Sequence, residues 1–224
     1  MRLLADGLYQ LRGFPPHWYN VYLADDVLID AASRHAARRI LRQVAGRAVR
    51  ALALTHVHPD HQGSSKAVCE RLGIPLWCGA GDVEPMQTGQ GFAGRQTNHP
   101  LNRVSRLVFA GPPHPVARAL REGDAVGSFT VLDTPGFSPG HVAFWREADR
   151  TLLAGDVVFG LNPTTGLPGL HVPPRHDMAD PARHGASARR LAALRPALVC
   201  FGHGPPLRDG ERFVDFVRRR LPAS

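Results

Sequence analysis

The chain has 224 residues, of which 43% are hydrophobic and 21% are charged, a composition typical of a folded protein rather than a disordered one. A formal net charge of +8 is compatible with nucleic-acid binding, but the arginines are scattered on predicted helix faces, so we favour a solvated surface without a nucleic-acid partner. The first residues lack the apolar stretch of a secretory signal, and no apolar run reaches membrane-spanning length, so we expect a cytoplasmic protein with no membrane partner.

The length fits a single domain over residues 1–224. The three cysteines Cys69, Cys78 and Cys200 have no paired zinc-ligand spacing, and their odd number argues against a complete disulfide framework. We expect each of them to be a small buried apolar residue.

Short apolar runs between turn residues predict strands, and apolar residues three and four positions apart predict helices. In chain order the sequence predicts strands at 8–11, 21–23 and 27–29, a helix at 36–44, a strand at 51–54 and a helix at 62–72. Further strands are predicted at 129–132, 142–145, 151–153 and 198–201, with helices at 181–194 and 211–221. This pattern indicates an α/β protein, with hairpins first and strand–helix units later.

Two segments contain no predicted element: 86–115, rich in Gly, Gln, Asn and Pro, and 160–178, which holds four prolines. Long irregular segments in compact domains are often functional loops. We therefore expect both to border an active site, and His171, Arg175 and His176 are candidates for meeting an anionic substrate.

Four residues with metal-ligating side chains, His56, His58, Asp60 and His61, follow the apolar run at 51–54 directly. Residues two apart in an extended chain project to the same side, so His56 and His58 can hold one cation together. Asp156 and His203 each follow another predicted strand. Imidazole and carboxylate ligands suit zinc, iron and related metals, and this clustering predicts a metal site.

The sequence resembles the metallo-β-lactamase-fold superfamily through His56-x-His58-x-Asp60-His61, the Thr134-Pro-Gly136 turn, Gly155-Asp156 and Gly202-His203-Gly204. The resemblance implies a four-layer αββα sandwich with its metals at one edge between the sheets. It also implies that His56 and His58 bind one metal, that Asp60, His61 and His203 bind the other, and that Asp156 bridges them. A water or hydroxide held by the metals would be the nucleophile, with secondary proton handling by Asp60 and Asp156.

One position departs from the family pattern, which typically reads Thr-Pro-Gly-His-Thr-x-Gly-His at the third strand end. Here Phe137 replaces the first of these histidines, which is a ligand of the first metal. His141 matches the second, and we expect it to form hydrogen bonds rather than to replace the missing ligand, although replacement stays open. The first metal position should therefore bind more weakly, so the resemblance implies one or two zinc ions, with iron or manganese as alternatives.

The resemblance implies a metal-dependent hydrolase of an ester, thioester, lactone or related bond in a small-molecule substrate. Glyoxalase II is a similar subgroup, but only 21 residues follow His203, too few for its glutathione-binding helical domain. Three alternatives stay open: an iron-dependent persulfide (sulfur) dioxygenase, an RNA-processing nuclease and a metal-impaired noncatalytic relative. The sequence predicts neither the substrate nor the oligomeric state.

Overall fold

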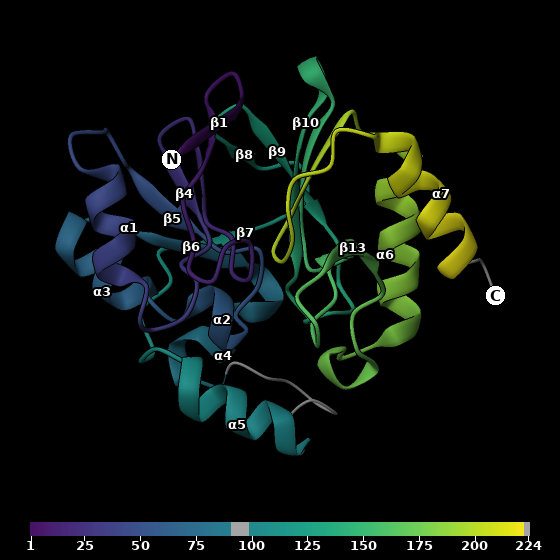
Figure 1. Ribbon diagram of the computed structural model, residues 1–224. Coiled ribbons are helices and arrows are strands. Elements are labelled where there is room, and N and C mark those ends of the chain that lie inside the picture. The colour runs from purple at the N-terminus through teal and green to yellow at the C-terminus, as the bar shows by residue number, and fades with distance from the viewer. Residues whose placement is uncertain (91–98, 222–224) are drawn as a thin grey trace.

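The fold was analysed in a computed structural model that describes residues 1–90 and 99–221. Two β-sheets lie face to face in the middle of the molecule, with helices on both outer sides (Figure 1). The first sheet contains seven strands in chain order: β1 (Arg2–Ala5), β2 (Leu8–Gln10), β3 (Tyr22–Ala24), β4 (Val27–Ile29), β5 (Ala51–Ala53), β6 (Leu76–Gly79) and β7 (Arg118–Leu120). Strands β1 to β4 pair antiparallel, as the predicted hairpins require, and β4 to β7 pair parallel.

The second sheet contains five strands in the order β14 (Leu198–Phe201), β11 (Thr151–Gly155), β10 (Val142–Arg146), β9 (Phe129–Asp133) and β8 (Ala125–Val126). Strands β14 and β11 are parallel neighbours, and the other pairs are antiparallel. Their side-by-side carboxyl ends bring Asp156 and His203 close together. A separate ribbon of β12 (Phe159–Leu161) and β13 (Pro168–His171) follows β11.

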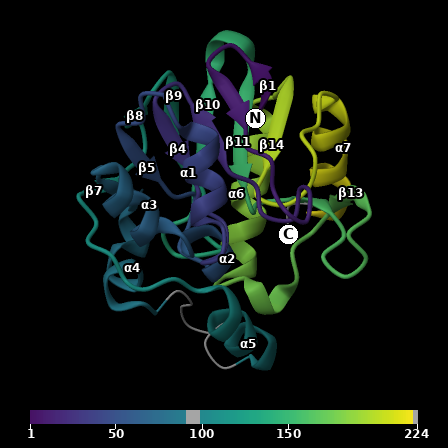
Figure 2. The same cartoon turned by 60° about the vertical axis from the view of Figure 1, so that its left-hand side comes forward.

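Helices α1 (Ala37–Val44) and α3 (Ser65–Leu72) lie on one outer side, and α6 (Pro181–Ala193) and α7 (Gly210–Arg220) lie on the other (Figures 1 and 2). The remaining helices are α2 (Pro59–Gln62), α4 (Val83–Thr88), α5 (Pro100–Phe109) and the 3₁₀ turns η1 (Ala80–Asp82), η3 (Glu147–Asp149) and η4 (Arg175–Asp177). Both views place α5 at the lower edge of the molecule.

Three apolar clusters correspond to the three interfaces between the layers. One fills the space between the sheets, with Val27 and Ala53 packed in the same cluster as Val131 and Phe144. The second joins the first sheet to α1 and α3, and the third joins the second sheet to α6 and α7. Strands buried on both faces explain the continuous apolar runs in the sequence. The predicted four-layer αββα sandwich is confirmed.

The structure corrects several expectations about individual elements. The segment 86–115, predicted to be irregular, contains α5, and its residues 91–98 lie outside the described part of the chain. The segment 160–178 contains β13 and η4, and the predicted helix 62–72 begins later, at Ser65, as α3, after the short α2 that ends at Gln62. Strands β1, β6, β7, β8 and β12 were not predicted.

The three cysteines are free and buried, as predicted. Among the described residues, no helix is both long and apolar enough to cross a membrane.

Candidate metal centre

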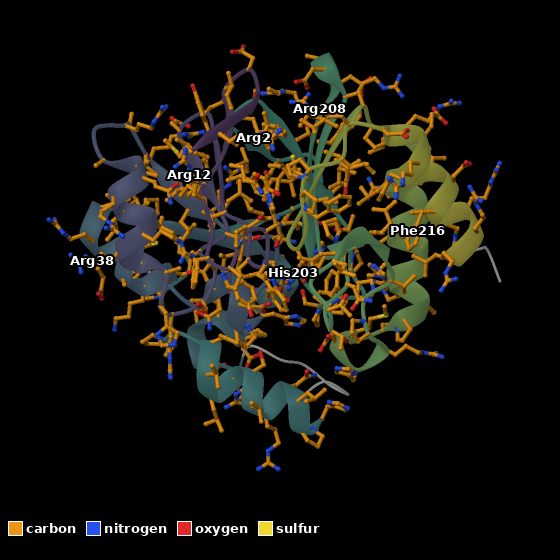
Figure 3. All side chains as sticks on the ribbon, viewed as in Figure 1. Arg2, Arg12, Arg38, His203, Arg208 and Phe216 are labelled. Atoms are coloured by element: carbon orange, nitrogen blue, oxygen red, sulfur yellow. The ribbon has the colours of Figure 1, made fainter. Side chains whose placement is uncertain are left out.

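Three strand ends supply the predicted ligands. Strand β5 of the first sheet leads into the turn that carries His56 and His58 and then into α2, which carries Asp60 and His61. Asp156 follows β11 directly, and His203 stands two residues after β14. Figure 3 shows His203 near the middle of the molecule, between the two halves of the sandwich.

The donor atoms of four of these residues converge. Asp156 Oδ2 lies 3.1 Å from His203 Nε2 and 3.3 Å from His61 Nε2, and the two Nε2 atoms are 3.3 Å apart. Asp60 Oδ2 lies 3.4 Å from His203 Nε2. All of these side chains except that of Asp60 are almost completely buried.

The spacings among His61, Asp156 and His203 match those between ligands of a single tetrahedral ion. Metal–ligand bonds of about 2.1 Å in tetrahedral geometry place the donor atoms about 3.4 Å from one another. In addition, His56 Nε2 and Asp156 Oδ1 are buried without a hydrogen-bond partner in the part of the chain that the structure describes. Buried polar atoms are normally paired, so a bound cation would satisfy atoms that are otherwise left unpaired. The residues present therefore fit a divalent metal.

Hydrogen bonds on the opposite side of the imidazole rings orient them. Asp30 Oδ2 accepts a hydrogen bond from His61 Nδ1 at 2.9 Å, and the carbonyl oxygen of Trp18 accepts one from His203 Nδ1. The Thr55 hydroxyl donates to Asp30 and so accepts from His56 Nδ1 at 3.0 Å. Each Nδ1 then carries the proton, which leaves the Nε2 lone pair for a metal.

The electrostatics of the buried imidazoles differ from one to the next. Burial alone lowers the pKa of His61, but the carboxylates of Asp156 and Asp30 outweigh it and raise that pKa well above its usual value. Burial, together with the imidazoles of His61 and His58, holds the pKa of His56 well below its usual range. A cation between the carboxylates and the imidazoles would take the place of the proton that the carboxylates stabilise on His61.

His58 and Phe137 lie together beside this centre. Two groups of close donors are found among the described residues, His56 with His61 and Asp156, and Asp60 with His61 and His203, and His58 belongs to neither. The His58 ring lies 4.7 Å from the ring of Phe137 and 4.5 Å from that of His56. The structure therefore brings five of the six predicted ligands into close donor groups and leaves His58 at their margin.

His141 forms hydrogen bonds through both ring nitrogens, which agrees with the role expected for it. Its Nδ1 lies 2.8 Å from Thr134 Oγ1, and its Nε2 accepts a hydrogen bond from the backbone N–H of Asp156 at 3.1 Å. His141 thus positions Asp156 through its backbone N–H group.

Two carboxylates that support the centre were not predicted. Asp30 follows β4, and its place after the apolar residues 27–29 was an available signal. Asp82 is completely buried and accepts hydrogen bonds from the Ser138 hydroxyl at 2.7 Å and from the backbone N–H groups of Gly140 and Val57. Burial raises the pKa of Asp82 to about 6. It connects the His56–His58 turn with the segment that carries Phe137.

A cavity of about 200 Å³ opens over the donor atoms. Both segments predicted to be irregular contribute to it, through Leu101, Asn102 and Ser105 of α5 and through His176 and Asp177 of η4. Phe137 and Phe159 form an apolar wall, and the other lining residues are His58, Asp60, Asp156 and His203. Burial, with the nearby carboxylates of Asp60 and Asp156, raises the pKa of Asp177 to about 7.

The three residues predicted to contact an anionic substrate do not lie together in the structure. Only His176 lines this cavity, whereas His171 lines another one beside α7, and Arg175 is not among the lining residues. The described residues that line the cavity over the donors include neither arginine nor lysine.

The αββα sandwich, with a His- and Asp-rich cluster of candidate metal ligands at the ends of three strands, has the architecture of the metallo-β-lactamase fold. The sequence model of the metallo-beta-lactamase superfamily matches residues 19–203. The chain belongs to the metallo-beta-lactamase superfamily.

Three similar proteins illustrate the relationship. The Bacillus subtilis (strain 168) protein named "Probable metallo-hydrolase YybB" is 28% identical over 208 residues, which cover 92% of this chain and 88% of that one. A metallo-beta-lactamase family protein from Thermus thermophilus superposes with a TM-score of 0.68 at 28% identity, covering 97% of this chain and 80% of that one. The protein TTHA1623, solved in a di-iron-bound form, superposes with a TM-score of 0.61 at 31% identity, covering 96% and 92%.

Proposed function

We propose that the protein is a zinc-dependent hydrolase of an ester, thioester or lactone bond in a small molecule. The observation that carries the proposal is the set of three donors, His61, Asp156 and His203, whose 3.1–3.3 Å mutual spacings suit ligands of one tetrahedral ion at the base of a cavity. Asp60 lies beside them, with its Oδ2 atom 3.4 Å from His203 Nε2. Zinc is favoured because two imidazoles and one carboxylate at these spacings suit its tetrahedral preference, and three protein ligands leave the fourth position for water.

A bound divalent ion lowers the pKa of a coordinated water toward neutrality and polarises the oxygen of the bond under attack. The protein residues then supply orientation and proton transfer. Asp60 is the most exposed of the four donors, with 21% of its side chain accessible, and it faces the cavity. Its carboxylate would be placed to accept a proton from the attacking water, while the backbone of Asp156 is held by the hydrogen bond from its N–H to His141.

The cavity defines the kind of substrate group that reaches the donors. A volume of about 200 Å³ accommodates a small acyl group or lactone ring beside the donors. The rings of Phe137 and Phe159 give one side an apolar surface, and the described lining has no guanidinium or ammonium group to pair with an anion. We therefore propose that the part of the substrate next to the scissile bond is uncharged.

The test is a hydrolysis assay with the zinc-loaded protein on a panel of a p-nitrophenyl ester, an acyl thioester and a lactone. We expect turnover of at least one member and its loss in His61→Ala. His35→Ala, which alters an exposed histidine outside the donor cluster, should retain the activity. A fully zinc-loaded protein that hydrolyses no member of the panel would contradict the proposal, and oxygen uptake with glutathione persulfide would favour the dioxygenase instead.

A further inference from the structure

We infer that this protein binds one divalent ion per chain, at His61, Asp156 and His203 beside Asp60, and that the side chain of Phe137 prevents a second ion from binding next to it. The inference rests on the proposed function only in that the donor cluster holds a divalent ion. It does not depend on which bond, if any, the protein hydrolyses.

The first argument is what Phe137 fills. Its ring is 2% exposed and lies 5.1 Å from the ring of His56 and 4.7 Å from that of His58, centroid to centroid. It packs in a buried cluster with Phe159 and Met178. A second ion bound by His56 and His58 would therefore have a hydrocarbon ring against it instead of a third imidazole, and it would have to share Asp156 with the other ion to reach three protein ligands. Such a neighbour also makes the burial of a charge costly.

The second argument is that His141 cannot take over. Its ring is 1% exposed, and both nitrogens are engaged, Nδ1 with Thr134 Oγ1 and Nε2 with the backbone N–H of Asp156. The Nε2 lone pair that accepts this N–H is the same lone pair that a metal would need. Coordination by His141 would therefore break the hydrogen bond that positions Asp156, which is a donor of the other ion.

The third argument concerns the two remaining imidazoles. His56 Nε2 lies 3.7 Å from Asp156 Oδ2, and His56 forms a group of close donors with His61 and Asp156. His56 therefore lies beside the residues of the proposed ion site. His58 belongs to no close donor group among the described residues. Of the two imidazoles at the second position, only His56 groups with further donors among the described residues, whereas the donor atoms of His61, Asp156 and His203 lie 3.1–3.3 Å from one another.

The test measures zinc per chain by elemental analysis after chelator treatment, reloading with excess zinc and desalting. We expect one ion in the unaltered protein and two in Phe137→His, which places an imidazole where the ring now lies. Phe137→Leu removes the ring without supplying a ligand and should stay at one. Adding His58→Ala should return Phe137→His to one ion, whereas His58→Ala alone should keep the single ion and His61→Ala alone should lose it.

Several results would overturn the inference. Two ions in the unaltered protein, or none, would do so directly, and so would loss of the single ion in His58→Ala. A Phe137→His protein that retains its circular dichroism spectrum and still binds one ion would show that Phe137 does not exclude the second. If Phe137→His does not fold, the two single histidine variants still decide which residues hold the ion. An inactive protein with one ion would support this inference while contradicting the hydrolase.

Discussion

Asp30 orients His61: its Oδ2 atom accepts a hydrogen bond from His61 Nδ1 at 2.9 Å, while both side chains are almost fully buried. The same carboxylate accepts the hydroxyl hydrogen of Thr55, and Thr55 in turn accepts from His56 Nδ1. One carboxylate thus determines which nitrogen of two imidazoles faces the donor cluster. Because ligand orientation contributes strongly to metal affinity, Asp30 belongs to the working centre although it contacts no ion.

Asp30→Asn should weaken zinc binding by about 10- to 100-fold. The amide has nearly the same size as the carboxylate, but it is neutral and presents an N–H₂ group in place of one acceptor oxygen. The measurement is zinc competition with a chromophoric chelator. Asp26→Asn is the matched control, because Asp26 lies near in sequence but forms an exposed ion pair with Arg50. Equal zinc affinity in Asp30→Asn and the unaltered protein would show that the Asp30–His61 hydrogen bond is unimportant for binding.

Gly202→Ala should disrupt the metal centre. A Cβ atom at this position would lie 2.0 Å from Asp156 Oδ1 and 2.6 Å from His61 Cε1, so at least one of these side chains must move. We expect less than half the zinc per chain of the unaltered protein and a lower Tm. Elemental analysis and thermal unfolding test this expectation, and full zinc occupancy in the variant would contradict it.

Gly185→Ala provides the control for the previous substitution. Gly185 lies inside α6, and the nearest atom to its added Cβ is Arg189 Nη1 at 3.3 Å, the end of a flexible side chain. Replacing a helical glycine by alanine stabilises a protein by about 0.5–1 kcal/mol. The variant should therefore unfold at a slightly higher temperature and bind zinc normally.

His184→Leu should reduce the loss of stability in acid. Burial is the main cause that lowers the pKa of His184 from 6.5 to about 4, so the unfolded chain takes up a proton more readily than the folded one. The stability contribution of neutral His184 is present above the unfolded pKa and is lost as the pH falls from there toward about 4.

From a pH of about 7 to about 5, protonation of His184 in the unfolded chain lowers the free energy of unfolding by ~2 kcal/mol. The leucine variant should not show this loss. Urea unfolding at the two pH values measures it, with His35→Leu as an exposed control. The same pH dependence in His184→Leu and the unaltered protein would rule out this role.

Asp180→Ala should destabilise the protein by about 1 kcal/mol, because Asp180 is the N-cap of α6. Its Oδ1 atom accepts hydrogen bonds from the backbone N–H groups of Ala182 at 3.0 Å and Arg183 at 3.1 Å. Asp180→Ser keeps a capping oxygen and should retain most of the stability. The free energy of unfolding of the two variants distinguishes the cap from a general effect of charge, and equal losses in both would argue against capping.

The sequence by itself determined the elements with strong local patterns and the residues that can bind metal. The apolar runs before His56, Asp156 and His203 predicted strands that end at these residues, because burial on both faces of a strand leaves a continuous apolar run. The helices that cover the sheets were predicted for a related reason, since Ile40 and Val44 of α1 repeat at helical spacing and are buried. The resemblance to the family pattern also showed Phe137 at a position where that pattern has a ligand.

Only the tertiary structure decided which donors meet and which do not. The pairing of β11 with β14 brings Asp156 to His203 across 47 positions of the chain, and no local period encodes such a pairing. The roles of Asp30, Asp82 and the Trp18 carbonyl depend on hydrogen bonds between segments distant in sequence. The positions of α5 and His58 relative to the donor atoms likewise depend on packing. A short helix or a single imidazole has no sequence pattern that specifies its neighbours.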